Sequence, residues 1–197
     1  MRCSDASRLP LPAVGRDSFR SYWRQLRSIE IYDIGVIDAG DDASQGFGVS
    51  HGGIAVGRSI RTGGSQAFTW TLNGGIVGLP NLAGRSHAVS NSANDNGVVV
   101  GTAATTLFGT SRLPVMWQNG AVSQLPLPPG ETLGDANSVN ASSVAVGSVD
   151  GGSLQRGAIY SGGSGTIITQ TTANGSSLSL HSASTTQAAS WARGSIR

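Results

Sequence analysis

Ile54-Ala55-Val56-Gly57 is the stretch of sequence that decides the fold, because closely similar stretches follow it twice more. The copies are Val98-Val99-Val100-Gly101 and Val144-Ala145-Val146-Gly147. Their glycines lie 44 and 46 residues apart. After each copy comes a segment that ends in an aromatic residue, and these segments are Gln66–Trp70, Leu113–Trp117 and Gly157–Tyr160. A fixed period in the forties is typical of a repeat architecture.

Each repeat predicts four short strands. The first strands are Gly48–Ser50, Ala88–Ser90 and Ser138–Asn140, the second are the Val-Gly stretches, the third end at the aromatic residues, and the fourth are Ile76–Leu79, Val122–Leu125 and Thr166–Thr169. The Val-Gly strands are apolar on both faces, which indicates inner strands covered on both sides. Four short antiparallel strands in each period are typical of a β-propeller blade.

Turn signals separate the predicted strands. Asn96-Gly97 predicts a type I′ hairpin turn, in which both central residues need a positive φ. Tyr32–Ile37 resembles the fourth strand of a preceding copy. Propellers close with about four to eight blades, so three repeats predict a partial propeller, a piece of a longer frame, or a chain that closes by association.

We therefore expect an all-β fold, a partial β-propeller of about three four-stranded antiparallel blades with a short N-terminal amphipathic helix. Three regions are expected: an irregular N-terminus with the helix over 1–30, the repeats over 31–170, and a Ser/Thr-rich segment over 171–197. The helix is indicated by apolar residues three or four positions apart, which are Phe19, Tyr22, Trp23, Leu26 and Ile29. It either covers an open sheet edge of its own domain or binds a membrane surface or a partner.

Composition excludes several function classes. All 13 basic residues are Arg, and seven of them face eight acidic residues after position 30, so the repeat region is near neutral and does not favour nucleic-acid binding. Cys3 is the one cysteine, which rules out a disulfide within the chain. No apolar run reaches the roughly 18 residues of a membrane span. The N-terminus also lacks the apolar stretch of a secretory signal.

The repeats resemble the HAF extracellular repeat, named for a His-Ala-Phe stretch before a Trp. Gln66-Ala67-Phe68-Thr69-Trp70 matches this stretch with Gln in place of His, and the upstream matches are Ala88-Val89-Ser90, Asn94–Gly97 and Val99-Val100-Gly101. The later copies depart from it at Pro114–Met116 and Gly157–Ile159. The resemblance covers about residues 32–170. It implies a bacterial surface or secreted repeat protein with a propeller-like fold, and it implies no activity and no catalytic residues.

One motif points to catalysis. Gly48-Val49-Ser50-His51-Gly52 fits the G-x-S-x-G pattern, in which a strand-to-helix turn exposes a nucleophilic Ser. Here strands are expected on both sides, so Ser50-His51 is interpreted as a hairpin turn. We place Ser90-Asn91 and Asn140-Ala141 at the equivalent positions of the other repeats.

Metal sites have weak support. The histidines His51, His87 and His181 lack metal-ligand spacing. Calcium could be bound by an acidic loop, which contains Asp38, Asp41 and Asp42, or by the isolated turn residue Asp95. The calcium-binding pattern D-x-D-x-D-G is absent, however. These carboxylates are interpreted as solvated turn residues, and no metal or cofactor is expected.

The recurrent aromatic residues Trp70, Trp117 and Tyr160 allow two interpretations. Exposed, they would form a platform for sugar rings or a partner. Buried, they would pack one repeat against the next, and recurrence at one position favours this role.

The predicted function is a non-enzymatic module for binding or scaffolding at a bacterial surface, with no catalytic residues. Its ligand, a protein or a glycan, would contact the variable loops Thr62–Ser65 and Thr105–Arg112. Open blade edges would be available for self-association. The alternative is a propeller-type glycan hydrolase or lyase, although the two glutamates, Glu30 and Glu131, do not recur. A third interpretation is a truncated fragment without independent function.

Overall fold

A computed structural model describes residues 30–106, 111–150 and 155–169. The chain divides into two compact units, Met1–Asp33 and Ile34–Arg197, and the strands found among the described residues all belong to the second. The described residues form strands, turns and irregular segments without any helix, so the all-β prediction is confirmed. The predicted N-terminal helix and the Ser/Thr-rich segment lie outside the described residues, apart from Glu30.

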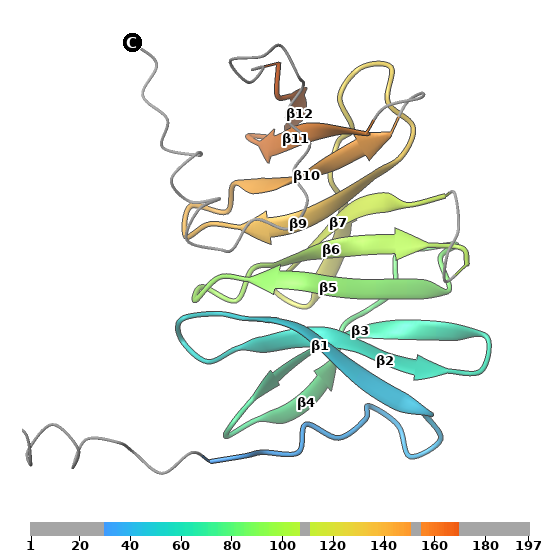
Figure 1. Cartoon of the computed structure of the whole chain (residues 1–197), viewed down its shortest axis with the longest axis vertical. Coiled ribbons are helices and arrows are strands. Elements are labelled where there is room, and N and C mark those ends of the chain that lie inside the picture. Colours follow the sequence, from blue (N-terminus) through green and yellow to red (C-terminus); the bar gives the residue numbers. More distant parts are fainter. Residues whose placement is uncertain (1–29, 107–110, 151–154, 170–197) are drawn as a thin grey trace, which may run out of the picture. The chain divides into compact units, whose positions relative to one another are not determined.

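Twelve strands form three successive antiparallel meanders of four (Figure 1). Meander 1 contains β1 (Ala43–Val49), β2 (Ala55–Arg61), β3 (Gly64–Thr71) and β4 (Gly75–Gly78). Meander 2 contains β5 (His87–Ala93), β6 (Val99–Ala104), β7 (Leu113–Gln118) and β8 (Ala121–Gln124). Meander 3 contains β9 (Gly134–Val139), β10 (Ala145–Asp150), β11 (Gln155–Ser161) and β12 (Ser164–Ile167). A single parallel pairing, Ser65 with His87, joins the first two meanders into one sheet, whereas meander 3 is a separate sheet.

The predicted second, third and fourth strands of all three repeats are confirmed, but two details were wrong. Tyr32–Ile37 is not a strand, because it pairs with no strand in the described part of the chain. In the second repeat, Ala88–Ser90 is not the counterpart of Gly48–Ser50. The registers instead align Ser92 with Gly48 and Ser138, because these three residues face Val100, Val56 and Val146 of the second strands.

A β-bulge at the same place in each first strand explains the Val-Gly signature. The pairing skips one residue in β1, β5 and β9, and the skipped residues are Phe47, Asn91 and Asn137. Beside each bulge a backbone carbonyl turns toward the glycine of the second strand. A Cβ on Gly57, Gly101 or Gly147 would overlap the carbonyl oxygen of Gln45, Val89 or Asp135, respectively. The glycine is therefore required by space, since its φ is not positive.

Two apolar cores lie between successive meanders, so that meander 2 is covered on both sides (Figure 1). Val99 and Ala103 of β6 belong to the core shared with meander 1. Val98 and Val100 belong to the core shared with meander 3. The alternation of side chains along one strand thus feeds both cores, as expected for an inner strand.

The recurrent aromatic position packs one meander against the preceding one. Trp117 is 2% exposed, and its indole Nε1 donates to the Pro80 carbonyl at 2.8 Å. Tyr160 is 1% exposed in the core between meanders 2 and 3. The packing interpretation is confirmed for these two residues. Trp70, in the first meander, is only half-buried.

The turn between the first and second strands is built from one polar side chain. The Asn94 side-chain oxygen accepts from the backbone N–H groups of Asn96 and Val98, both at 3.0 Å. Asn140 repeats this arrangement with Ser142 and Val144, at 2.9 and 3.0 Å. The predicted type I′ turn at Asn96-Gly97 is wrong, because only the glycine has a positive φ (78°). The polar side chain closes a longer turn instead.

Candidate binding groove

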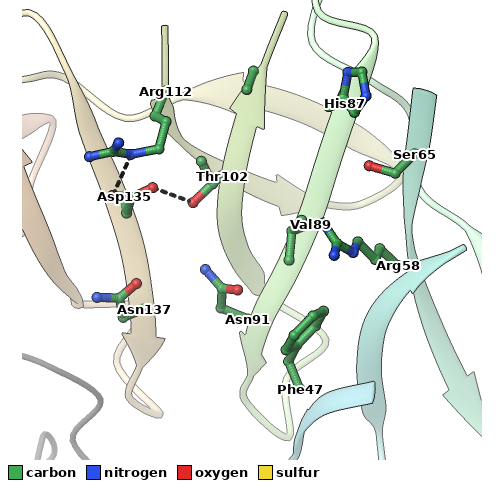
Figure 2. Close-up of a pocket in the computed structure, with 11 residues that line it drawn as sticks. Phe47, Arg58, Ser65, His87, Val89, Asn91, Thr102, Arg112, Asp135 and Asn137 are labelled. Carbon is green, nitrogen blue, oxygen red and sulfur yellow. Dashed lines mark hydrogen bonds and ion pairs between the residues drawn. The ribbon is translucent and has the colours of Figure 1, made fainter. Parts of the chain in front are cut away.

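An open groove of about 500 Å³ crosses the first strands of all three meanders (Figure 2). The contacts between β1 and β5 and between β5 and β9 place these strands side by side. The groove is lined by apolar, amide and charged side chains, which are Phe47, Arg58, Ser65, His87, Val89, Asn91, Thr102, Ala104, Arg112, Asp135 and Asn137. We refer to these eleven residues as the groove.

The three bulged residues, Phe47, Asn91 and Asn137, all line the groove. A bulge changes the direction of a side chain relative to a regular strand. The same distortion that requires the glycine therefore supplies one groove residue from each meander. The groove consequently presents one aromatic ring and two amides at equivalent positions.

Arg58 is the cation at the meander 1 end of the groove. Its Nε and one terminal nitrogen both donate to the Gln45 side-chain oxygen, at 2.9 and 2.8 Å. Its guanidinium carbon lies 5.7 Å from the centre of the Phe47 ring, within the range of a cation–π contact. No carboxylate in the described part of the chain forms an ion pair with Arg58. Its charge is thus held in place and is open to an anionic group.

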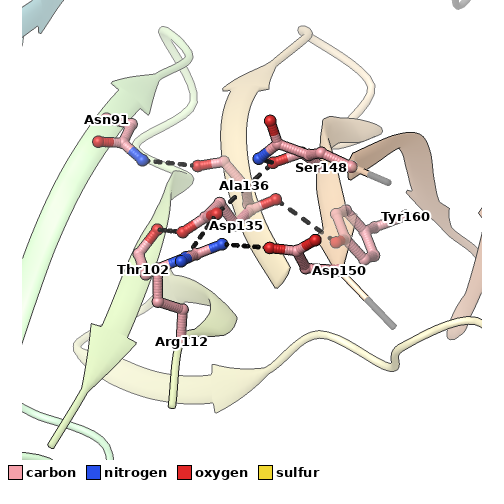
Figure 3. Close-up of polar contacts among 9 residues, drawn as sticks. Asn91, Thr102, Arg112, Asp135, Ala136, Ser148, Asp150 and Tyr160 are labelled. Atoms are coloured by element: carbon pink, nitrogen blue, oxygen red, sulfur yellow. Dashed lines mark hydrogen bonds and ion pairs between the residues drawn. The ribbon is translucent and has the colours of Figure 1, made fainter. Parts of the chain in front are cut away.

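The other end of the groove is a closed polar network (Figures 2 and 3). Arg112 Nε lies 3.0 Å from one oxygen of Asp135, and an Arg112 terminal nitrogen lies 3.3 Å from Asp150. The Thr102 hydroxyl donates to the second Asp135 oxygen at 3.0 Å. Asp135 is the one carboxylate among the groove residues, and its charge is already neutralised.

The network continues behind the groove into the core between meanders 2 and 3 (Figure 3). The Tyr160 hydroxyl is 3.4 Å from the backbone carbonyl of Asp135. Burial raises the pKa of Tyr160 above its ordinary value, and the charges of Asp135 and Glu131 raise it further. Asn91 donates to the Ala136 carbonyl at 2.9 Å, which ties the groove floor to meander 3.

The structure places Ser50 in a hairpin turn and not on a strand-to-helix elbow. β1 precedes it and β2 follows, so the turn interpretation is confirmed. The Ser50 hydroxyl accepts from the Ile54 N–H at 3.2 Å and is largely buried. Its counterpart in meander 2 is Asn94, and the proposed counterpart Ser90-Asn91 was wrong because of the register error described above.

The predicted histidines do not come together. His51 lies in the β1–β2 turn, whereas His87 begins β5 and has Nδ1 3.0 Å from the Ser86 hydroxyl. His181 lies outside the described residues. Of the three, His87 is a groove residue, which its sequence context did not indicate.

The acidic residues considered for calcium have structural partners. Their interpretation as solvated residues was wrong for Asp41, whose side chain is 2% exposed, whereas Asp38 and Asp95 are exposed. Asp38 and Asp41 both form ion pairs with Arg61, at 3.1 and 3.2 Å. A 2.6 Å hydrogen bond from the Ser59 hydroxyl is the main cause that lowers the pKa of Asp41. Asp95 accepts from the Gly52 N–H at 2.5 Å, which lowers the pKa of Asp95 and links meander 1 to meander 2.

The predicted binding loops contribute in part. Ser65 and Arg112, at the ends of the two variable loops, line the groove, while residues 107–110 of the second loop lie outside the described residues. The sequence reasoning missed the other lining residues of the first strands. A signal was present, since Phe47, Asn91 and Asn137 each lie ten positions before a Val-Gly glycine.

Comparison with protein families, characterised proteins and solved structures found no match to this chain. Within residues 30–106, 111–150 and 155–169, no cluster of three or more His, Cys, Asp or Glu is arranged to hold a metal ion. The same residues contain no helix that is long and apolar enough to span a membrane.

Proposed function

We propose that this chain is a non-enzymatic binding module and that the groove is its ligand site. The observation that carries the proposal is Arg58, a cation held by Gln45 and Phe47 at the meander 1 end of the groove without an ion-pair partner among the described residues. A guanidinium binds carboxylates with two parallel hydrogen bonds. An anionic ligand therefore has a defined point of attachment.

The remaining groove residues favour a glycan that carries carboxylates. Phe47 is 50% exposed and offers an apolar ring beside the cation. The Asn91 and Asn137 amides and the His87 imidazole can exchange hydrogen bonds with hydroxyl groups. An open groove that spans three meanders suits an extended chain of sugar rings better than a compact small molecule, which binds in enclosed pockets.

A glycan hydrolase is less well supported by the same geometry. Glycoside hydrolysis uses two carboxylates about 5–10 Å apart on either side of the bond. Asp135 is the one carboxylate of the groove, and Arg112 and Thr102 already occupy both of its oxygens.

We further propose that each meander is a propeller blade and that the protein works at a bacterial surface or after secretion. Four consecutive antiparallel strands, a buried second strand and neighbouring first strands support the blade interpretation. The resemblance of Gln66–Trp70 and Asn94–Gly101 to the HAF extracellular repeat supports the location.

Calorimetric titration of the full chain with acidic oligosaccharides tests the proposal. We expect binding of oligouronides that weakens as salt rises, and no binding of the matched neutral oligosaccharides. Arg58→Gln should weaken binding about tenfold, the loss of one charge-assisted contact. Arg85→Gln is the matched control, because Arg85 is half-buried and hydrogen-bonded to the Ser111 carbonyl but does not line the groove.

Three results would contradict the proposal. Equal affinity of the Arg58→Gln and Arg85→Gln variants would place the site elsewhere. Absence of binding to every acidic glycan would reject this ligand class, and binding of an acidic peptide alone would replace it with a protein ligand. Release of shorter sugars during the titration would favour the hydrolase.

A further inference from the structure

One face of meander 1 carries an apolar row that is buried in the other two meanders. The row crosses the sheet through paired residues, which are Val49, Ala55, Trp70 and Ile76. Its counterparts in meander 2 are Ala93, Val99, Trp117 and Val122. The meander 2 row packs against meander 1 and belongs to the core between them.

The row on meander 1 is more exposed to solvent than the equivalent rows of meanders 2 and 3. Val49 is 64% exposed, whereas Ala93 and Val139 at the same position are each 5% exposed. Ala55 and Trp70 are half-buried, whereas their counterparts Val99 and Trp117 are each 2% exposed. Ile76 and its counterpart Val122 are both half-buried. The row on meander 1 therefore has the composition of a meander interface without its burial.

Meander 3 carries the surface that fits this row. In the core between meanders 1 and 2, the row of meander 2 packs against Ile54 and Val56 of β2 and its preceding turn. The counterparts of these residues in meander 3 are Val144 and Val146. Val144 is half-buried and Val146 is 7% exposed, so Val144 is the residue of this pair that is accessible to a partner.

Polar groups match as well. Asn91 and Asn94 of meander 2 donate to the carbonyls of Ala136 and Asn140 in meander 3, both at 2.9 Å. Asn137 and Asn140 repeat these two side chains one meander later, and no described residue accepts from their amide nitrogens. The corresponding carbonyls on meander 1 are those of Gly46 and Ser50.

We propose that a second copy of this chain docks head to tail, with its meander 3 seated on the exposed row of meander 1. The contact repeats the interface between meanders 2 and 3, and it rests on the blade interpretation proposed above. It shares Asn137 with the groove, but Val49 does not line the groove, so a substitution of Val49 tests the contact separately from the groove ligand. Because the two faces differ, the contact is heterologous, and two chains can close a ring with two such contacts. Two chains supply six meanders, within the range of about four to eight blades that closed propellers use.

Sedimentation velocity of the full chain over a range of concentrations tests this proposal. We expect a reversible dimer in the unmodified protein. Val49→Asp should weaken association by about tenfold or more, because it buries an unpaired carboxylate in an apolar contact. Val77→Asp is the matched control, since Val77 is also an exposed strand valine (54%) but lies on the opposite face of the sheet from Trp70 and Ile76.

A complementation experiment tests the head-to-tail geometry. Asn137→Asp with Asn140→Asp removes the two amide donors, and the carboxylate introduced by Asn140→Asp can still accept hydrogen bonds in the turn, so this variant should also be monomeric. In a mixture of the two monomeric variants, the unmodified meander 3 of the Val49→Asp chain can dock on the unmodified meander 1 of the other chain. The mixture should therefore form a heterodimer through one intact contact.

Each alternative outcome overturns the proposal. A monomeric unmodified chain at every concentration would mean that no second copy occupies the face. Equal loss of association in the Val49→Asp and Val77→Asp variants would place the contact elsewhere. Absence of a heterodimer in the mixture would exclude the head-to-tail arrangement.

Discussion

Replacing the glycine of the first Val-Gly stretch should be severely destabilising, although a glycine directly opposite it can be replaced without loss. Gly57 of β2 and Gly46 of β1 are cross-strand partners. A Cβ on Gly57 would overlap the Gln45 carbonyl oxygen and come within 2.8 Å of Phe68 Cζ. A Cβ on Gly46 would have nothing within 4 Å. The two Ala variants therefore share a strand pair and differ only in the space available.

The expected change in unfolding free energy depends on whether the atoms around each glycine can shift to make room for a methyl group. Neither neighbour of Gly57 can withdraw easily, because Gln45 contributes a backbone carbonyl of a paired strand beside the bulge and Phe68 is fully buried. We expect Gly57→Ala to cost about 3 kcal/mol, the upper end for forcing one methyl group into a packed site. Gly46→Ala should stabilise by about 0.5–1 kcal/mol, since glycine loses more backbone entropy than alanine when a strand forms.

Urea unfolding followed by tryptophan fluorescence measures both effects. With an m-value of about 2 kcal/mol/M, Gly57→Ala lowers the midpoint by about 1.5 M and Gly46→Ala raises it by about 0.3–0.5 M. A Gly57→Ala midpoint within 0.5 M of the unmodified protein, on the order of 1 kcal/mol, would refute the steric explanation of the Val-Gly signature.

Two further predictions concern the turns. Ser143 has a φ of 61°, and glycines, Gly53 and Gly97, occupy the equivalent positions of the other two repeats. Ser143→Gly should therefore stabilise the chain by about 0.5–1 kcal/mol in the same unfolding assay, and a destabilised variant would contradict this. Ser142→Gly is the control, because Ser142 has no positive φ to relieve. The Gly52 N–H lowers the pKa of Asp95 in the folded chain, so its contribution to stability is present above the ordinary pKa of about 3.9 and is lost as the pH falls through the lower folded value. Asp95→Asn should therefore flatten the loss of unfolding free energy between about pH 4 and pH 2, and an unchanged slope would show that Gly52 does not stabilise the carboxylate.

The repeat and most strands were predictable because apolar residues mark the second and third strands directly. Val98, Val99 and Val100 feed two cores, and such a strand shows as an unbroken apolar run. The first strands were harder to place. A bulge shifts the alternation of side chains by one position. In the second repeat, Ala88–Ser90 was predicted to be the whole first strand, but the strand continues past the bulge to Ala93.

The groove was largely beyond sequence reasoning. Its three bulged residues have no common chemistry, because Phe47 stands where the other repeats have Asn91 and Asn137. Their fixed distance from the glycine was visible, but it had no meaning until the bulge explained it. Asp135 and Arg112 are also far apart along the chain, and only the packing of β9 near the end of the β6–β7 connection brings them together.

The order of the meanders is specified by polar side chains more than by the apolar cores. The apolar rows of successive meanders are similar, so hydrophobic burial alone would tolerate a wrong neighbour, a known hazard of repeat proteins. The polar contacts differ at each junction. Asp95 meets Gly52 between meanders 1 and 2, whereas Arg112 meets Asp135 between meanders 2 and 3. Either carboxylate placed at the wrong junction would lose its partner, and the cost is larger for Asp135, whose side chain is 17% exposed, than for the exposed Asp95. The groove runs across both junctions, so the contacts that fix the order of the repeats also fix the positions of the groove residues relative to one another.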